Sequence, residues 1–173
     1  MIQTDFLVLG SGIAGLSFAL KAADYGEVIV LTKAGENESN TKYAQGGIAS
    51  VISEEDSFDL HIEDTLRAGA GLCDRRTVEL VVREGPRMIR ELGGLGVPFS
   101  RQEGNGEFEL GMEGGHTRRR ILHVRDFTGR EIEAALVARI RNRPEIRLLQ
   151  YHTAIDLVTR RKARIAPNDD RVI

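Results

Sequence analysis

The residues with the clearest chemical meaning stand near the N-terminus, where three glycines recur at a fixed spacing. Gly10, Gly12 and Gly15 form a GxGxxG pattern between an apolar run at 6–9 and apolar residues at helical spacing from Ile13 onward. The first glycine permits a tight turn, the second lets backbone approach a pyrophosphate, and the third lets helix and strand pack closely. The pattern therefore predicts a dinucleotide site formed by Gly10, Ser11, Gly12, Ile13, Ala14 and Gly15.

The end of the second predicted strand bears on which dinucleotide is bound. A plain NAD site has an acidic residue about 20 positions after the glycines, where it holds the ribose hydroxyls. Here Thr32 and then Lys33 occupy that place. This difference favours FAD, with Lys33 on the adenosine side. The alternative is a tight glycine turn that binds no ligand.

A second glycine-rich segment follows in a long loop without apolar periodicity. The pair Gly46-Gly47 lacks the side chains that would keep backbone away from a large planar ring. Gln45 and Thr41 offer hydrogen bonds to the edge of such a ring, which would tune its electronics. The alternative is a glycine turn before a strand.

This loop resembles the flavin-contacting segment of the succinate dehydrogenase and fumarate reductase flavoprotein family. The resemblance implies that the ring is contacted by Asn40, Thr41, Lys42, Tyr43, Ala44, Gln45, Gly46 and Gly47. The resemblance extends over the whole chain, which would form only the N-terminal portion of such a protein. Respiratory members attach FAD covalently through a histidine a few residues before the matching glycines. Asn40 stands in that place and cannot form the bond. The resemblance therefore implies FAD that is bound non-covalently.

Within the family, the segment 112–116 is most similar to the branch that oxidises L-aspartate. Glu113 stands where members specific for dicarboxylates tend to have an aromatic residue. A carboxylate near the α-carbon of the substrate would pair with the ammonium group that distinguishes aspartate from succinate. Glu113 is therefore the candidate for recognition of the substrate ammonium. From spacing alone, the alternative is a solvated carboxylate paired with Arg118, Arg119 or Arg120.

The resemblance implies FAD-dependent oxidation of L-aspartate to iminoaspartate, the first step of de novo NAD biosynthesis. Oxygen or fumarate would accept the electrons, and quinolinate synthase would use the imine. The other catalytic residues of the family would lie beyond residue 173. Two alternatives stay open: a soluble enzyme of the fumarate reductase or succinate dehydrogenase type, and a truncated nucleotide-binding fragment without turnover of its own.

An α/β framework is needed to position these residues. The pattern of apolar runs predicts a Rossmann-like, doubly wound FAD-binding domain over residues 1–173, incomplete at its C-terminus. Its predicted parts are a βαβ dinucleotide unit at 5–32, a flavin loop at 33–49, a helical segment at 57–93, a glycine-rich loop at 93–116, and a helix with strands at 128–160.

Some local patterns predict finer detail. Pro86 is expected to begin a new helical turn after Gly85. The capping-box pattern of 128–131 predicts Thr128 as the N-cap of the last helix, after a turn at Asp126. Residues 146–149 and 154–158 are expected to be strands, and the glycine-rich loop is expected to form a hairpin or a mobile segment.

Composition argues against several other classes of protein. The chain has a net charge of −2 and 41% hydrophobic residues, and no apolar stretch is long enough to span a membrane. The single cysteine, Cys73, excludes an internal disulfide and favours a cytoplasmic location. His116 and His123 have no carboxylate at ligand spacing, so no metal is expected. The arginine run at 118–120 lacks interleaved aromatics, which favours a solvated or docking face over nucleic-acid binding.

Overall fold

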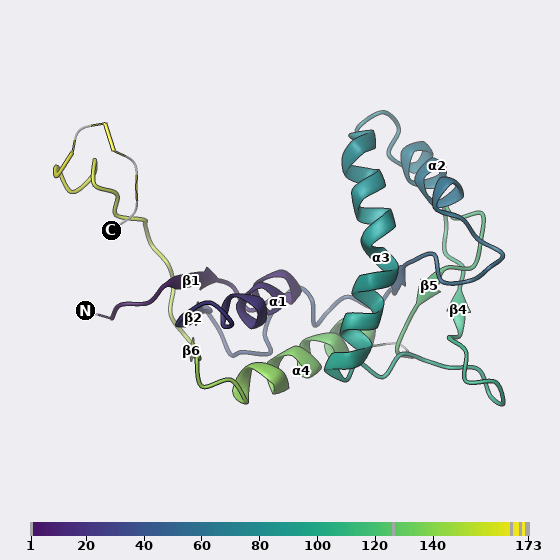
Figure 1. The fold of residues 1–173 in the computed structure, drawn as a ribbon, viewed down its shortest axis with the longest axis horizontal. Helices are drawn as coiled ribbons and strands as arrows, with labels where there is room; N and C mark the ends of the chain where they lie inside the picture. The colour runs from purple at the N-terminus through teal and green to yellow at the C-terminus, as the bar shows by residue number, and fades with distance from the viewer. Residues whose placement is uncertain (1, 126, 167, 170, 172–173) are drawn as a thin grey trace.

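A parallel sheet and a smaller antiparallel sheet form the framework of the chain (Figure 1). The computed structural model describes residues 2–125, 127–166, 168–169 and 171. In the parallel sheet, β1 (Phe6–Leu9), β2 (Val28–Leu31) and β6 (Ile146–Leu149) lie in the order β1-β2-β6. The register pairs Leu7 with Ile29, and Ile29 with Arg147. The predicted βαβ unit and the strand at 146–149 are confirmed.

Two helices cover this sheet and close the main core. α1 (Ile13–Ala22) connects β1 to β2 and packs against α4 (Thr128–Arg141). Leu16, Ala19 and Leu136 are fully buried between these elements. The helical spacing of apolar residues in α1 and α4 thus gives each helix one apolar face, and that face packs into the core.

The middle of the chain forms a separate group of elements at the other end of the molecule (Figure 1). Helices α2 (Phe58–Ala68) and α3 (Arg75–Leu95) pack together around a small cluster that includes Ile62, Val78 and Val82. The antiparallel sheet joins β3 (Ile48–Ala49), β5 (Ile121–Leu122) and β4 (Leu110–Gly111) in the order β3-β5-β4. This sheet brings the end of the predicted flavin loop and the predicted glycine-rich loop to one place.

The predicted helix start at Pro86 is wrong. α3 runs without interruption from Arg75 to Leu95, with Pro86 inside it. Proline removes one backbone donor, but its fixed φ is compatible with a helix. The apolar stripe continues across it, since Val82 before it and Ile89 after it are both buried. Burial on one continuous face therefore outweighs the lost hydrogen bond.

The predicted N-cap at Thr128 is also wrong. The N-cap of α4 is Phe127, and Thr128 is the first residue of the helix. The Thr128 hydroxyl accepts a hydrogen bond from the backbone N–H of Val124, at 3.0 Å. That bond ties the helix to the turn before it, so the hydroxyl is not available to cap the helix. The predicted turn residue Asp126 lies outside the described residues.

The prediction for the glycine-rich segment is confirmed, whereas the prediction for the segment after β6 is wrong. Arg101 and Phe108 form an antiparallel bridge, so the predicted hairpin is confirmed. The strand predicted at 154–158 is wrong, because these residues form no strand and Ile155 is 95% exposed. A strand needs a neighbour to satisfy its backbone groups, and no described strand pairs with this segment. Among the described residues, no helix is both long and apolar enough to cross a membrane.

The third glycine of the N-terminal pattern gives a direct test of the β1–α1 crossing. A Cβ on Gly15 would overlap the carbonyl oxygen of Gly10, so we expect Gly15→Ala to lower the free energy of unfolding by about 1–3 kcal/mol. Gly93→Ala in α3 is the control, because nothing lies within 4 Å of its Cβ position. The control should raise stability by about 0.5–1 kcal/mol. Denaturant unfolding measures both, and unchanged stability of Gly15→Ala would contradict the packing described.

Candidate functional site

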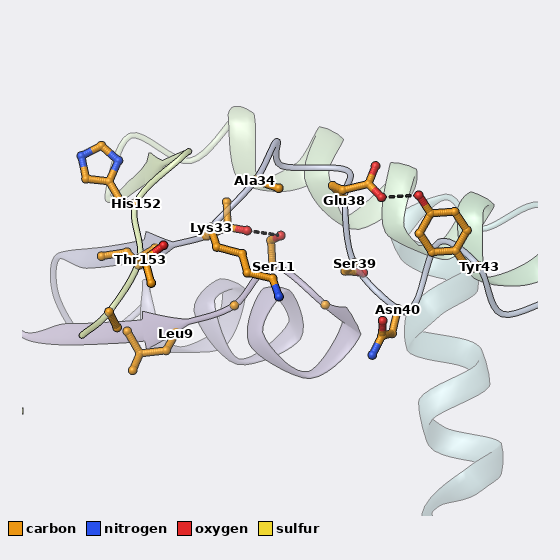
Figure 2. Close-up of a pocket in the computed structure, with 15 residues that line it drawn as sticks. Leu9, Ser11, Lys33, Ala34, Glu38, Ser39, Asn40, Tyr43, His152 and Thr153 are labelled. Atoms are coloured by element: carbon orange, nitrogen blue, oxygen red, sulfur yellow. Dashed lines mark hydrogen bonds between the residues drawn. The ribbon is translucent and has the colours of Figure 1, made fainter. Parts of the chain in front are cut away.

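A cavity of about 460 Å³ lies at the carboxyl ends of β1 and β2 (Figure 2). Its walls are formed by the glycine loop, the end of β2, residues within 38–43 of the predicted flavin loop, and residues 152–154. Ligands of open α/β sheets bind outside the carboxyl ends of the strands. The cavity is therefore where the fold itself favours a bound dinucleotide.

The glycine loop leaves its backbone open toward this cavity. Gly10 has φ of +103°, and a Cβ placed on it would meet no atom within 4 Å. Gly12 is the N-cap of α1 and has no side chain of its own, and the Thr41 hydroxyl takes up only the N–H of Ile13 at this end of the helix. The helix N-terminus thus directs backbone N–H groups and the positive end of its dipole toward the cavity. These features fit a pyrophosphate, as the sequence pattern predicts.

The end of β2 contributes one structural group and one cation. The Ser11 hydroxyl donates to the Thr32 hydroxyl at 3.1 Å, and both residues are buried. Thr32 therefore ties the glycine loop to β2. Lys33 is exposed, lines the cavity, and extends its ammonium group toward the side of Ser11 (Figure 2). Its position fits the predicted place beside a bound nucleotide.

The predicted flavin loop is clamped between α1 and α4. Thr41 Oγ1 accepts a hydrogen bond from the backbone N–H of Ile13, at 3.1 Å. On the other side, the Gly129 N–H donates to the Ala44 carbonyl at 3.1 Å, and a Cβ on Gly129 would overlap the Thr41 carbonyl. Because α4 begins so close to the loop, only glycine fits at 129.

A buried carboxylate that the sequence analysis missed supports the same loop. Glu133 of α4 is 1% exposed, and its carboxylate accepts a hydrogen bond from the Ser39 hydroxyl. Burial raises the pKa of Glu133, and the bond from Ser39 opposes that rise. The available signal is its spacing: Glu133 lies on the same helical face as Gly129 and Val137, which are both buried.

The other polar residues of the loop interact with one another. The Tyr43 hydroxyl donates to the Glu38 carboxylate, and Lys42 Nζ lies 2.9 Å from the same group. These hydrogen bonds lower the pKa of Glu38. Asn40 and Tyr43 line the cavity, whereas Lys42 borders a neighbouring one with Gly35 and Tyr151. The loop thus has hydrogen bonds among its own side chains.

The glycine pair meets the predicted substrate residue. A Cβ on Gly47 would overlap the Leu122 carbonyl, so the backbone lies directly against β5. A Cβ on Gly46 would lie 3.5 Å from Oε1 of Glu113. Glu113 is exposed, and among the described residues none forms an ion pair with it. The structure thus brings Gly46 and Glu113 together, and the alternative pairing of Glu113 with an arginine is absent.

The expectation of a solvated arginine run is wrong for Arg120. Arg120 is fully buried, and its guanidinium contacts Asp56 through two hydrogen bonds of 2.8 Å. A third bond of 2.8 Å reaches Asp64 in α2. The alternative expectation of a docking face holds for Arg120, because its buried side chain binds acidic residues. The carboxylates lie far away in the sequence, so no local pattern shows the pairing.

Asp64 carries a strongly shifted pKa. Burial by itself would raise the pKa of this carboxyl, but it accepts hydrogen bonds from the backbone and hydroxyl of Thr117 and from Arg120. Together these interactions lower the pKa to about 2. Asp64 is therefore ionised throughout the physiological range of pH.

Two histidines, His61 and His116, lie beside the ion pair of Arg120 and Asp64. The rings of His61 and His116 have centroids 5.7 Å apart, and Arg120 Nη1 lies 3.2 Å from His116 Nδ1. Since a guanidinium can only donate, Nδ1 of His116 is the acceptor. Burial lowers the pKa of His61, a residue that is 7% exposed. No group of three or more metal-ligating side chains occurs among the described residues.

Comparisons with known proteins agree with this geometry. Residues 5–171 match the family described as FAD binding domain. Over 155 residues the chain is 52% identical to the protein from Nicotiana tabacum named L-aspartate oxidase 2-b, chloroplastic. It is 46% identical over 164 residues to the L-aspartate oxidase of Vibrio cholerae. These alignments cover 90% and 92% of the chain, but only 24% and 31% of the relatives.

Solved structures show the same fold. The chain superposes on E. coli quinol fumarate reductase with a TM-score of 0.85 and 29% identity, covering 91% of this chain and 27% of that one. The Sdh1 complex of Mycobacterium smegmatis gives a TM-score of 0.81 and 31% identity, covering 90% and 29%. The chain therefore spans about a quarter to a third of the length of the proteins it matches.

The depressed pKa of Asp64 makes stability depend on pH in acid. The pKa is about 2 in the folded chain against an ordinary 3.8, so the ionised carboxylate stabilises the fold fully above pH 3.8. On the order of 2 kcal/mol should be lost as the pH falls from about 4 toward 2. Asp64→Asn should be less stable near neutrality and show a flatter dependence in this window. Unfolding measured at several pH values checks this; an equally steep profile in Asp64→Asn would contradict it.

Proposed function

Because the chain belongs to the family of FAD-binding domains, we propose that it is the FAD-binding part of an enzyme that oxidises L-aspartate to iminoaspartate. One observation carries the proposal: the Glu113 carboxylate lies beside Gly46, on the loop that continues from the dinucleotide cavity. The names of the relatives from Nicotiana tabacum and Vibrio cholerae support the choice of substrate.

The chain would hold FAD through backbone more than through side chains. The loop from Gly10 to Gly15 and the N-terminus of α1 would bind the pyrophosphate, and Lys33 would lie on the adenosine side. Residues 40–47, clamped by Thr41 and Gly129, would lie against the ring. When bound, FAD supplies the acceptor for the two electrons removed from the substrate. Asn40 offers no covalent attachment, so the cofactor would be held non-covalently.

Glu113 would select the substrate by charge. L-aspartate differs from succinate by an ammonium group, and an unpaired carboxylate is a strong partner for that group. Without the ammonium, the same carboxylate would face a substrate that also carries negative charge, which disfavours succinate. Glu113 therefore orients the substrate and discriminates against its close analogue. The remaining catalytic residues would belong to the part of the enzyme that this chain does not span.

Several wider features go with this function. We propose oxygen or fumarate as the electron acceptor, the first step of de novo NAD biosynthesis as the metabolic role, and a functional link to quinolinate synthase. A reducing compartment such as the cytoplasm is proposed because Cys73 is the single cysteine of the chain.

A fumarate reductase or succinate dehydrogenase type of enzyme is the second candidate. The superposition on E. coli quinol fumarate reductase favours it. The two candidates differ in the compound that reduces the bound flavin, because only the first needs an ammonium group on the substrate. Anaerobic reduction of the holoenzyme by L-aspartate and by succinate, side by side, separates them.

Replacing Glu113 tests the proposed role most simply. We expect Glu113→Gln in the holoenzyme to lower kcat/KM for L-aspartate by about 10- to 100-fold, because one charge-assisted hydrogen bond is lost. Oxidation of succinate should not weaken. Glu103→Gln, an exposed carboxylate in the preceding hairpin, is the matched control and should change neither value. Equal kinetics for Glu113→Gln and the unaltered enzyme would show that Glu113 does not bind the ammonium.

The mode of flavin attachment can be tested separately. Since Asn40 cannot form the covalent bond, acid precipitation of the yellow holoenzyme should release the colour into the supernatant. The absorbance of the supernatant and of the redissolved pellet measures this. Colour that remains with the pellet would mean covalent flavin and would disprove the role given to Asn40.

A further inference from the structure

The segment that carries Glu113 is a loop whose two ends are fixed by the small antiparallel sheet. It connects β4 to β5, and the Arg120 N–H donates to the Gly111 carbonyl at 3.1 Å where the loop closes. Inside the loop, the His116 N–H donates to the Glu113 carbonyl at 3.3 Å. This turn links the position of the Glu113 backbone to whatever holds His116 and the next residue, Thr117.

Thr117 is held by a single buried carboxylate on α2. Both its backbone N–H and its hydroxyl donate to Oδ2 of Asp64, each at 2.8 Å. The side chain of Asp64 is 2% exposed, whereas Thr117 lies at the surface. A carboxylate with two donors from one residue fixes both the place and the orientation of that residue.

Arg120 completes the anchor. Its Nη1 donates to the same Oδ2 of Asp64 and lies 3.2 Å from Nδ1 of His116. Asp56 holds the rest of the guanidinium through two parallel bonds, which fixes its plane. The Glu113 loop thus has three bonds to a unit that is buried and rigid: two from Thr117 and one to His116. Glu113 itself has no ion pair in the described structure, so its location depends on the loop.

We propose that Asp64 and Thr117 are positioning residues that set substrate specificity by holding Glu113 beside Gly46. The proposal rests on the function proposed above, in which Glu113 binds the substrate ammonium. Neither residue needs to touch the substrate. Loss of the anchor lets the loop move, so the carboxylate spends less time where the ammonium binds. Discrimination between L-aspartate and succinate then falls, while the electron transfer itself changes less.

Thr117→Val tests the proposal in the holoenzyme, because it removes the hydroxyl donor and keeps the shape of the side chain. We expect the ratio of kcat/KM for L-aspartate to that for succinate to fall about 3- to 10-fold, mostly through KM for L-aspartate. Thr117→Ser restores the hydroxyl and should restore the ratio. Asp59→Asn, on the exposed face of the same helix α2, is the control and should leave it unchanged. Asp64→Asn should lower the ratio further if it folds.

A purely structural role predicts a different result. In that case Thr117→Val would lower the Tm and leave the ratio unchanged, and the proposal would be overturned. The double variant Glu113→Gln with Thr117→Val separates the two mechanisms again. If Thr117 acts through Glu113, the double variant shows no further loss beyond Glu113→Gln; an additive loss would contradict the positioning role.

Failure of the proposed function gives its own signature. If Glu113→Gln leaves the ratio unchanged, Glu113 does not bind the ammonium, whatever Thr117 does. The anchor is then judged by amide hydrogen exchange. Faster exchange at 113–117 in Thr117→Val, with unchanged exchange at 103–106, supports an anchored loop. Unchanged exchange at 113–117 would overturn the anchor as well.

Discussion

A guanidinium with no access to water determines the shape of the half of the chain that carries Glu113. Arg120 is fully buried, and a buried charge of this kind is tolerated only when it is paired with opposite charge and hydrogen-bonded. Asp56, Asp64 and His116 together supply four hydrogen-bond partners, and the two carboxylates are themselves buried against Arg120. The three side chains form one unit, because removal of any member would leave an uncompensated charge in the interior. The start of β5, the start of α2 and the loop between β4 and β5 are held where this unit requires.

The nucleotide half depends on a different constraint, the close approach of backbone to backbone. At Gly15 the helix α1 crosses β1 so closely that a Cβ would overlap a carbonyl oxygen, and at Gly129 the helix α4 approaches the flavin loop in the same way. The loop at 39–47 joins the two halves. It bonds to α1 through Thr41, rests on α4, and passes Glu113 before it enters β3. The proposed cofactor site and the proposed substrate residue Glu113 are thus neighbours because one loop contacts both.

Features that depend on neighbours in sequence could be predicted from sequence. The order of strand, glycine loop and helix over residues 6–22 depends only on neighbouring residues, and the structure confirms it. The buried run of β2 is equally local. Arg120 could not be predicted, since its partners lie 64 and 56 residues away, and three successive arginines resemble a solvated face. The predictions at Pro86 and Thr128 are wrong for a related reason, because each rests on a local rule for helix boundaries. At Pro86 the buried face of α3 continues through the proline. At Thr128 the hydroxyl accepts a hydrogen bond from Val124 and does not cap the helix.

The residues of the candidate site likewise fall into those that the sequence predicts and those that only the structure shows. The glycine loop and Lys33 follow from spacing and Asn40 from the resemblance, and the structure places them around one cavity. Gly129 and Glu133, which support the flavin loop from α4, were missed because their contacts are with residues far earlier in the chain. Glu113 was found only through the resemblance to a known family. Spacing alone suggested a surface ion pair, whereas the structure places its carboxylate against Gly46.

A crystal structure of the holoenzyme with FAD and a bound substrate analogue that carries an ammonium group would show whether Glu113 binds that group beside the cofactor. The measured quantity is the distance from the Glu113 carboxylate to that ammonium, together with the position of the pyrophosphate. We expect a hydrogen-bond distance between the Glu113 carboxylate and the ammonium, and a pyrophosphate at the N-terminus of α1. An ammonium bound by another residue, with Glu113 turned to solvent, would contradict the role proposed for Glu113.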